Sequence, residues 1–154
     1  NDNHPNPQPA VMSRTRSLLR LSALPTNHDL ALLLLRLWLG GALLWLHGLG
    51  KLERLFADEV RFRSVFGLSP AQSLALAVVG EVVAPALLMV GLASRWAAAL
   101  SAITMATAFT VGHGMALSGE RSGELPFIFL AGFLALLIAG PGRYSVDAMG
   151  KSSA

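Results

Sequence analysis

The sequence predicts an all-α protein, a four-helix transmembrane bundle with its N- and C-termini on the same side of the membrane. The first observation is composition: 53% of the 154 residues are hydrophobic and only 14% are charged, against roughly 25% charged in an average soluble domain. The second is a mean hydropathy of +0.55, because a soluble domain of this size could not bury so much apolar surface. The third is that four stretches approach the roughly 20 apolar residues that cross a bilayer core.

The spans define one membrane domain with a tail on either side. The predicted spans are, in chain order, about 30–50, 72–92, 96–117 and 125–140. They belong to a single domain, residues 30–147, since the length of the chain allows only one. The polar, proline-rich segment 1–29 is expected to be a disordered or flexible tail, and residues 148–154 form a C-terminal tail.

The connection between the first two spans, residues 51–71, is longer than the others. Apolar residues recur in it at roughly helical spacing, with charged residues mostly between them. Such a pattern indicates one or two turns of interfacial helix on the outer surface. A loop packed over the end of the bundle is an equally good interpretation.

Orientation follows from the placement of basic residues. An even number of spans puts both termini on one side, together with six basic residues, and leaves five on the other. The six are Arg14, Arg16, Arg20, Arg95, Arg143 and Lys151. Since the N-terminal cluster usually sets the topology, both termini are expected in the cytoplasm, with the protein as a multi-pass component of a bacterial inner membrane.

The absence of cysteine limits the chemistry that the side chains of this protein can carry out. The chain contains no cysteine, so it forms no disulfide, thiolate metal site or CxxC redox pair. Electrons in any redox role would have to be carried by a quinone, a haem or a partner protein. The net charge of +3 is spread thinly, and no basic patch with interleaved aromatic residues indicates nucleic-acid binding.

Two charged residues lie within the apolar spans, Arg36 in the first and Glu81 in the second. An unpaired charge at such a position is costly, and a rise of 1.5 Å per residue puts the two at depths that differ by only several ångströms. We therefore expect an Arg36–Glu81 ion pair. Pro85, four residues after Glu81, should free the Glu81 carbonyl and kink the helix. The pair either forms a functional polar core or only fixes helix register.

A second group of polar residues lies toward the outer ends of the spans. His47 and His113 are each about one turn from the outer end of helices that run in the same direction, and Lys51 is one turn beyond His47 on the same face. Glu124 enters the fourth span nearby. Such a set can bind a quinone headgroup, a metal ion or a haem. The alternative is that each histidine is an interfacial residue bonded to a backbone carbonyl.

Several ordered motifs resemble those of the DoxX family of small four-helix membrane proteins. They are "LRLWLGGALLWLHGLGKL", "FGLSP", "GEVVAPALLMVGLASRWAA" and "GPGRYSVD", which together cover about residues 30–147. The resemblance implies that the family pattern includes Arg36, Lys51, Glu81, Arg95 and the turn 140–147. It also implies that Glu124 matches the acidic residue found near the start of the last helix.

The resemblance also suggests a function. Some family members resemble subunits of membrane-bound oxidoreductases, including a thiosulfate:quinone oxidoreductase, and others resemble accessory proteins in redox or metal-stress systems. We therefore expect an integral-membrane subunit of a quinone-linked oxidoreductase system, with Arg36 and Glu81 in catalytic positions. His47, Lys51, His113 and Glu124 would bind the cofactor, a quinone, with no metal site.

Two other functions fit the same residues. The first alternative is a non-catalytic membrane anchor or assembly subunit of a larger complex, and a less favoured one is a small transporter with Glu81 as proton site. Whether the chain is itself an enzyme stays open, because a fold does not determine a reaction. The expected partners are the lipid bilayer and either other protein subunits or further copies of this chain.

Overall fold

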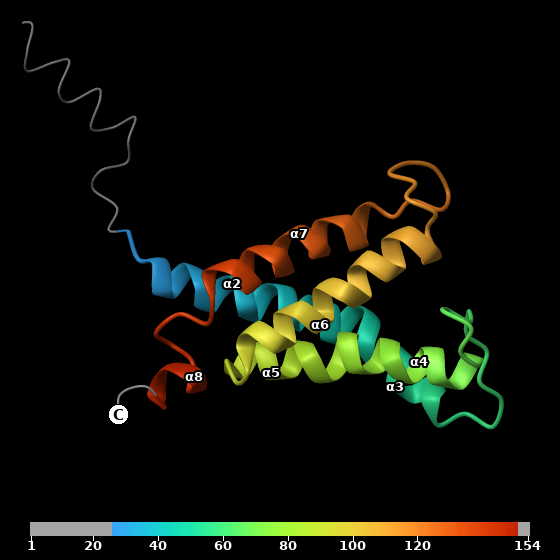
Figure 1. Cartoon of the computed structure of the whole chain (residues 1–154), viewed down its shortest axis with the longest axis horizontal. Helices are drawn as coiled ribbons and strands as arrows, with labels where there is room; N and C mark the ends of the chain where they lie inside the picture. Colours follow the sequence, from blue (N-terminus) through green and yellow to red (C-terminus); the bar gives the residue numbers. More distant parts are fainter. Residues whose placement is uncertain (1–25, 151–154) are drawn as a thin grey trace, which may run out of the picture.

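The computed structural model describes residues 26–150, and within that range every regular element is helical. Four long helical segments run back and forth (Figure 1). In chain order they comprise α2 (His28–Leu43), η1 (Leu44–Gly48) and α3 (Leu49–Leu55); α4 (Pro70–Val78), η2 (Val79–Val83) and α5 (Ala84–Val90); α6 (Ser94–Thr107) and η3 (Ala108–Gly112); and α7 (Glu124–Ala139). A short helix, α8 (Val146–Met149), follows. The segments η1, η2 and η3 are π-helical turns, with i→i+5 hydrogen bonds, inside or at the end of longer helices.

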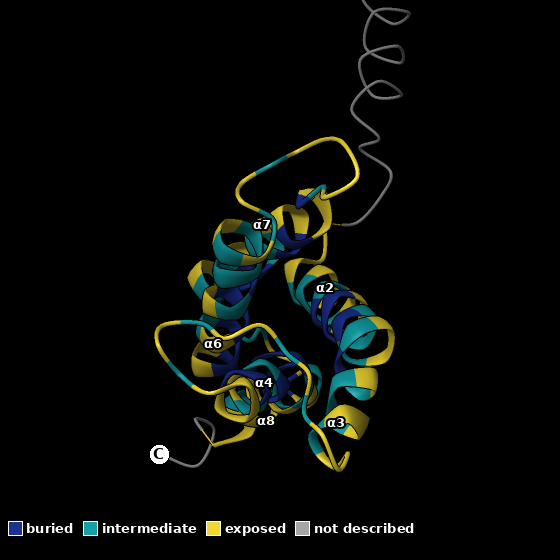
Figure 2. Cartoon of the chain, turned by 90° about the vertical axis from the view of Figure 1, so that its right-hand side faces the viewer, coloured by how far each residue is buried: buried dark blue, intermediate teal, exposed yellow. Residues whose placement is uncertain are grey.

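The long segments form a closed ring. The first segment packs on the second through α2 with α5 and α3 with α4, α5 packs on α6, α6 on α7, and α7 back on α2. Figure 2 shows this arrangement in end view, with the buried faces turned inward. The two ends of the described chain, residues 26 and 150, lie at the same end of the helices (Figure 1).

Local signals explain where the helices begin and end. The Asn27 side chain accepts a hydrogen bond from the Leu30 N–H, 2.9 Å, and so caps α2. At α4, Ser69 and Gln72 form a reciprocal capping box, and Pro70 occupies the first turn. Gly91 ends α5 with a φ of +79°, in the left-handed region that glycine reaches without strain.

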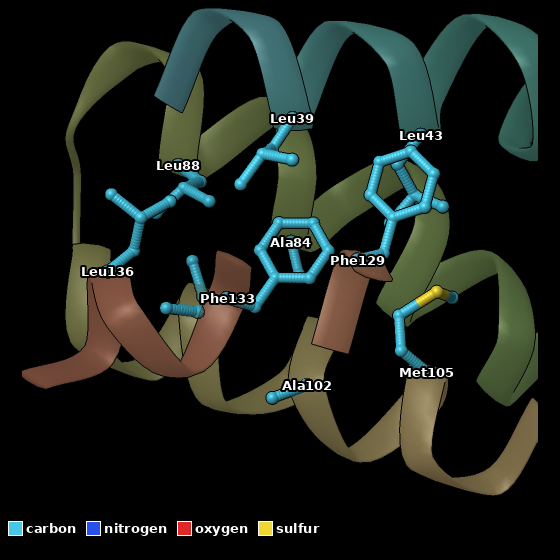
Figure 3. Packing of buried hydrophobic residues seen from close by; sticks show 11 residues of the cluster. Leu39, Leu43, Ala84, Leu88, Ala102, Met105, Phe129, Phe133 and Leu136 are labelled. Carbon is cyan, nitrogen blue, oxygen red and sulfur yellow. The ribbon is translucent and has the colours of Figure 1, made fainter. Parts of the chain in front are cut away.

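The core is small and lies where the four segments meet. It comprises Leu39, Leu43, Ala84, Leu88, Ala97, Ala98, Ala102, Met105, Phe129, Phe133 and Leu136, and Figure 3 shows how Phe129 and Phe133 fill the space between α2, α5 and α6. Alanine and serine on the buried face of α6 allow its backbone to approach α7 closely. Most other large apolar side chains point outward, including Trp38 and Trp45.

Two of the helical segments, His28–Leu55 with 28 residues and Pro70–Val90 with 21, are long and apolar enough to cross a membrane, and Glu124–Ala139 is a shorter apolar helix. The first helix is longer than the predicted span at both ends, so His47 lies two turns inside it. The third segment ends at Gly112, not near residue 117, so His113 directly follows its helix. Residues 28 and 29 belong to α2 and not to a tail. The described residues do not include 1–25 and 151–154, so most of the predicted tails lies outside them, together with the basic residues Arg14, Arg16, Arg20 and Lys151.

The connection between α3 and α4 contains no helix: α3 ends at Leu55, and residues 56–69 form turns and irregular chain. The predicted connection began at residue 51, and its first residues, 51–55, are helical as the continuation of the first helix in α3. A separate interfacial helix is absent from residues 56–69, where the alternative, a loop over the end of the bundle, applies. Three of its apolar residues, Phe62, Val65 and Phe66, line a cavity together with residues of α4 and α6.

Candidate functional site

The carboxylate of Glu81 is paired with Lys51. Lys51 Nζ donates to Glu81 Oε2 from one turn beyond His47, joining the first helical segment to the second. The Glu81 side chain is only 4% exposed and that of Lys51 23% exposed. Each charge therefore has its counterion at a position where an isolated one would be costly.

Arg36 does not pair with Glu81, so that part of the sequence interpretation is wrong. Its guanidinium is fully buried and points toward the end of the bundle that holds residues 26 and 150, where Nη2 donates to the Tyr144 carbonyl. Its Nε and Nη1 have no hydrogen-bond partner among residues 26–150. Arg36 and Glu81 thus bind different partners toward opposite ends of the bundle: Arg36 binds the Tyr144 carbonyl, and Glu81 binds Lys51.

The C-terminal turn supplies the other groups near Arg36. Asp147 accepts hydrogen bonds from the backbone N–H groups of Ala93 and Ser94, both 2.8 Å, and so caps α6 from outside its own helix. Burial acts to raise the pKa of Asp147, but these N–H donors and the positive charge of Arg36 outweigh it and hold the pKa below its ordinary value. This cluster is a structural latch between the first helix, the start of α6 and the chain's last turn.

Each of the three residues His47, Glu81 and His113 lies in or directly after a π-helical turn. His47 is in η1, Glu81 is in η2, and His113 follows η3. Such turns are rare in proteins as a whole, and those that occur are often at functional sites. Periodicity at 3.6 residues per turn could not reveal them.

Pro85 lies two residues after the π-turn that contains Glu81. Because proline has no N–H, it cannot donate to the carbonyls of Glu81 and Gly80, four and five residues earlier. Ser101 Oγ on α6 donates to the Gly80 carbonyl at 3.0 Å. The Glu81 carbonyl, which the sequence predicted Pro85 would leave free, lies against Gly48, where an added Cβ would overlap it. The first and third helices thus both contact the backbone around Glu81.

Two cavities meet at the Lys51–Glu81 pair. The smaller, about 310 Å³, is lined by Leu43, His47, Lys51, Glu81, Met105, Ala108, His113, Ser122, Leu125, Pro126 and Phe129. The larger, about 390 Å³, extends from the same pair between α4 and α6 and under the loop 56–69. Lys51, Glu81, Ala108 and His113 line both cavities. The ion pair therefore lies where the two spaces meet.

The two histidines make different contacts in the smaller cavity. His113 Nδ1 lies 3.1 Å from the Arg121 carbonyl; since a carbonyl only accepts, Nδ1 is the donor and Nε2 of the neutral ring is left as an acceptor. The His47 ring meets the Phe129 ring edge-on, with centroids 6.2 Å apart. The structure thus brings His47, Lys51, Glu81 and His113 around one space.

The remaining predicted site residue, Glu124, is not part of this group. It is exposed, begins α7, and its N–H bonds to Ser122 Oγ at 3.2 Å. The described residues contain no group of three or more His, Cys, Asp or Glu side chains placed to hold a metal ion. The sequence contains no signal for two residues of this site. Ser101 is an ordinary small residue of α6, and Arg63, which lines the larger cavity, lies in a loop where no helical periodicity could place it.

Comparison with known protein families identifies the family of the chain. The DoxX family model matches residues 31–114, more than half of the chain. The matched stretch contains Arg36, His47, Lys51, Glu81 and His113, and it ends before Glu124 and the latch residue Asp147. No curated protein and no solved structure matches the chain.

Proposed function

Because the chain belongs to the DoxX family, a family of small membrane proteins, we propose that it is an integral-membrane subunit of a quinone-linked oxidoreductase system. The observation that carries this proposal is the buried Lys51–Glu81 pair at the junction of two cavities. Each cavity falls within the range of about 300–1,000 Å³ typical of small-molecule sites. An ion pair that only stabilised the packing would be surrounded by side chains. The Lys51–Glu81 pair has a cavity on two sides, which favours a role in binding a ligand.

The proposed topology is four crossings of a bacterial inner membrane with both termini in the cytoplasm. Two helical segments are long enough to cross, and α7, with 16 residues, extends for about 24 Å. Arg95 and Arg143 lie at the end of the bundle that holds the two described chain ends. The sequence places the cluster Arg14, Arg16 and Arg20 just before that end, and such an N-terminal basic cluster favours the cytoplasm. In that orientation the Lys51–Glu81 pair lies in the outer half of the membrane.

The donor set suits a quinone headgroup, whose two carbonyl oxygens accept hydrogen bonds. Lys51 Nζ carries three N–H donors and gives one to Glu81, which leaves donors for a ligand in either cavity. His113 Nε2 is an acceptor, suited to a hydroxyl. Phe129 and Leu43 provide apolar walls against a ring.

When bound, a quinone carries two electrons and two protons between redox partners. The chain's own residues would supply the proton side of that chemistry. Glu81 can hold a proton at Oε2 when Lys51 turns to the ligand, and His113 Nε2 can accept a proton from a ligand hydroxyl while Nδ1 keeps its bond to the Arg121 carbonyl. Burial keeps bulk water from the Glu81 carboxylate, whose side chain is 4% exposed.

Lipid extraction of the protein tests this function. Protein purified in mild detergent from its native membrane should carry quinone at a fixed ratio, measured by chromatography of the extract. His47→Leu and His113→Leu should each lower that ratio, and the double variant should be little worse, since one lost contact already weakens the shared site. His28→Leu is the matched control, because His28 is exposed at the start of α2 and lines neither cavity.

The second candidate function is a non-catalytic anchor or assembly subunit. It is favoured by the absence of cysteine from the chain, which leaves no thiol to carry electrons. A wild-type preparation that retains its protein partners but contains no quinone would refute the quinone site and support the anchor.

A further inference from the structure

We propose that the larger cavity is a binding groove for the hydrocarbon chain of an isoprenoid quinone, which enters sideways from the bilayer between α4 and α6 with its headgroup toward the Lys51–Glu81 pair. This inference rests on the proposed function and adds the class of quinone and its route of entry. It assigns the smaller cavity to the headgroup.

The walls of the larger cavity are apolar and face outward. Leu76 on α4 is 53% exposed and Ile103 on α6 is 63% exposed, and both line the cavity. On a membrane-spanning helix these surfaces contact lipid chains and not water. The part of the wall on α6 and η3 runs from Leu100 to Gly112, about 18 Å along the helix.

The hydroxyl groups in this wall do not require a polar ligand. Thr104 Oγ1 donates to the Leu100 carbonyl at 3.0 Å, and Thr107 Oγ1 donates to the Ile103 carbonyl at 2.9 Å. Both bonds lie within α6, so each threonine presents its methyl group as readily as its oxygen. The wall can therefore accept a hydrocarbon chain without leaving a polar group unsatisfied.

The loop 56–69 closes the cavity at the end of the bundle. Phe62 and Phe66 line the cavity from this loop. Arg63 Nη1 donates to the Gly112 carbonyl at 3.3 Å, and the Val65 N–H donates to Ser73 Oγ at 3.1 Å, which tie the loop to both walls. In the end view of Figure 2 the loop from α3 to α4 lies across this end of the bundle. With the end covered, the exposed wall between α4 and α6 is the way in.

Charge fixes the direction in which an amphiphile would bind. Apart from Arg63 in the loop, the charged residues of the larger cavity, Lys51 and Glu81, lie where it joins the smaller one. The polar end of a ligand is drawn to that junction and its apolar chain to the groove. A short, water-soluble quinone would use only the junction.

Tryptophan substitutions in the groove test the proposal. Ala77→Trp places a large ring in the cavity, since Ala77 lines it from α4. Excluding even two methylene groups of the chain should lower retention of the isoprenoid quinone about tenfold, measured per protein in lipid extracts. Binding of a labelled headgroup analogue without a chain, measured by equilibrium dialysis in detergent, should be unchanged.

Two further variants keep this test independent of folding. Ile103→Trp fills the groove from an exposed position of α6, where a larger side chain is tolerated, and should reproduce the selective loss. Ala86→Trp is the matched control, because Ala86 is exposed on α5 and lines neither cavity; it should retain both ligands.

The outcomes separate this inference from the proposed function. If the groove variants retain the isoprenoid quinone, or lose both ligands equally, the hydrocarbon chain of the quinone does not lie in this groove. The proposed headgroup site at the Lys51–Glu81 pair is not affected by that outcome. If wild-type extracts contain a phospholipid at fixed ratio and no quinone, the proposed function fails and this inference with it. Selective loss of the long-chain quinone alone supports both.

Discussion

Lys51 on the first helical segment and Glu81 on the second form an ion pair whose two members line both the larger and the smaller cavity described above. The pair joins two helices, each of which has a π-helical turn at or next to this contact. Gly48 lies against the Glu81 carbonyl from the same side. Stability and ligand binding should therefore both depend on this contact, in ways that can be separated.

The partner of Glu81 can be identified with a double-mutant cycle. Glu81→Gln and Lys51→Met should each destabilise the detergent-solubilised protein by roughly 1–3 kcal/mol, since each leaves a partly buried charge without its partner. The double variant should recover much of that loss in the free energy of unfolding. The control cycle uses Arg36→Met with Glu81→Gln, for which losses should simply add; coupling there and additivity for Lys51 would contradict the assignment.

Asp147 should make the stability depend on acid. Its pKa is lower in the folded protein than the ordinary value of 3.8. A lowered carboxyl pKa contributes stability that is complete above the unfolded value and is lost as the pH falls through the folded one. The free energy of unfolding should therefore fall below about pH 4 by more in the wild type than in Asp147→Asn.

At neutral pH, Asp147→Asn should cost about 1–3 kcal/mol, because hydrogen bonds to a charged acceptor are replaced by weaker ones. Asp58→Asn, at an exposed position of the loop, serves as the control and should change neither the stability nor its pH dependence. Parallel acid profiles for the wild type and Asp147→Asn would show that the carboxylate does not hold the start of α6.

Gly48 is required for the close approach of the first two helical segments. A Cβ at Gly48 would overlap the backbone oxygen of Glu81, which no side-chain rotation relieves. Gly48→Ala should destabilise the protein by about 1–3 kcal/mol through overpacking and should disturb the Lys51–Glu81 pair. Gly50→Ala, two residues on, faces open space and should be neutral or slightly stabilising in a helix; equal effects of the two substitutions would be inconsistent with this packing.

The proposed topology can be tested by cysteine labelling, since the chain has no cysteine of its own. Thr26→Cys and Gly150→Cys should react only with a membrane-permeant reagent in intact cells. Asp58→Cys and Gly119→Cys should react with an impermeant one. Labelling of Thr26→Cys and Gly150→Cys from opposite sides would exclude an even number of crossings, and labelling of both from outside would invert the orientation.

The sequence alone determined the all-helical fold and the approximate position of each of the four long helical segments, but not the short helix α8. Composition and the length of apolar runs are sufficient for that, because a chain that buries its backbone polar groups in a bilayer has few choices besides the helix. The ordered motifs also indicated the family that the match over residues 31–114 shows. Helix ends were less predictable, as at Gly112 and Leu55, since hydropathy does not register where a helix stops.

Only the tertiary structure decided which charge meets which. The depths of the two residues along straight helices predicted that Arg36 would pair with Glu81. The π-turn at residues 44–48, however, adds a residue to one turn of the first helix and so rotates the position of Lys51 around the helix axis. Arg36 instead finds the Tyr144 carbonyl and the charge of Asp147, which lie more than a hundred residues away in the chain. A hydropathy pattern shows how many charges in the apolar spans need a partner. The partner of each charge depends on the rotation of the helices about their axes, on close contacts such as that at Gly48, and on residues distant in the sequence, such as Tyr144, that fold back beside the helix.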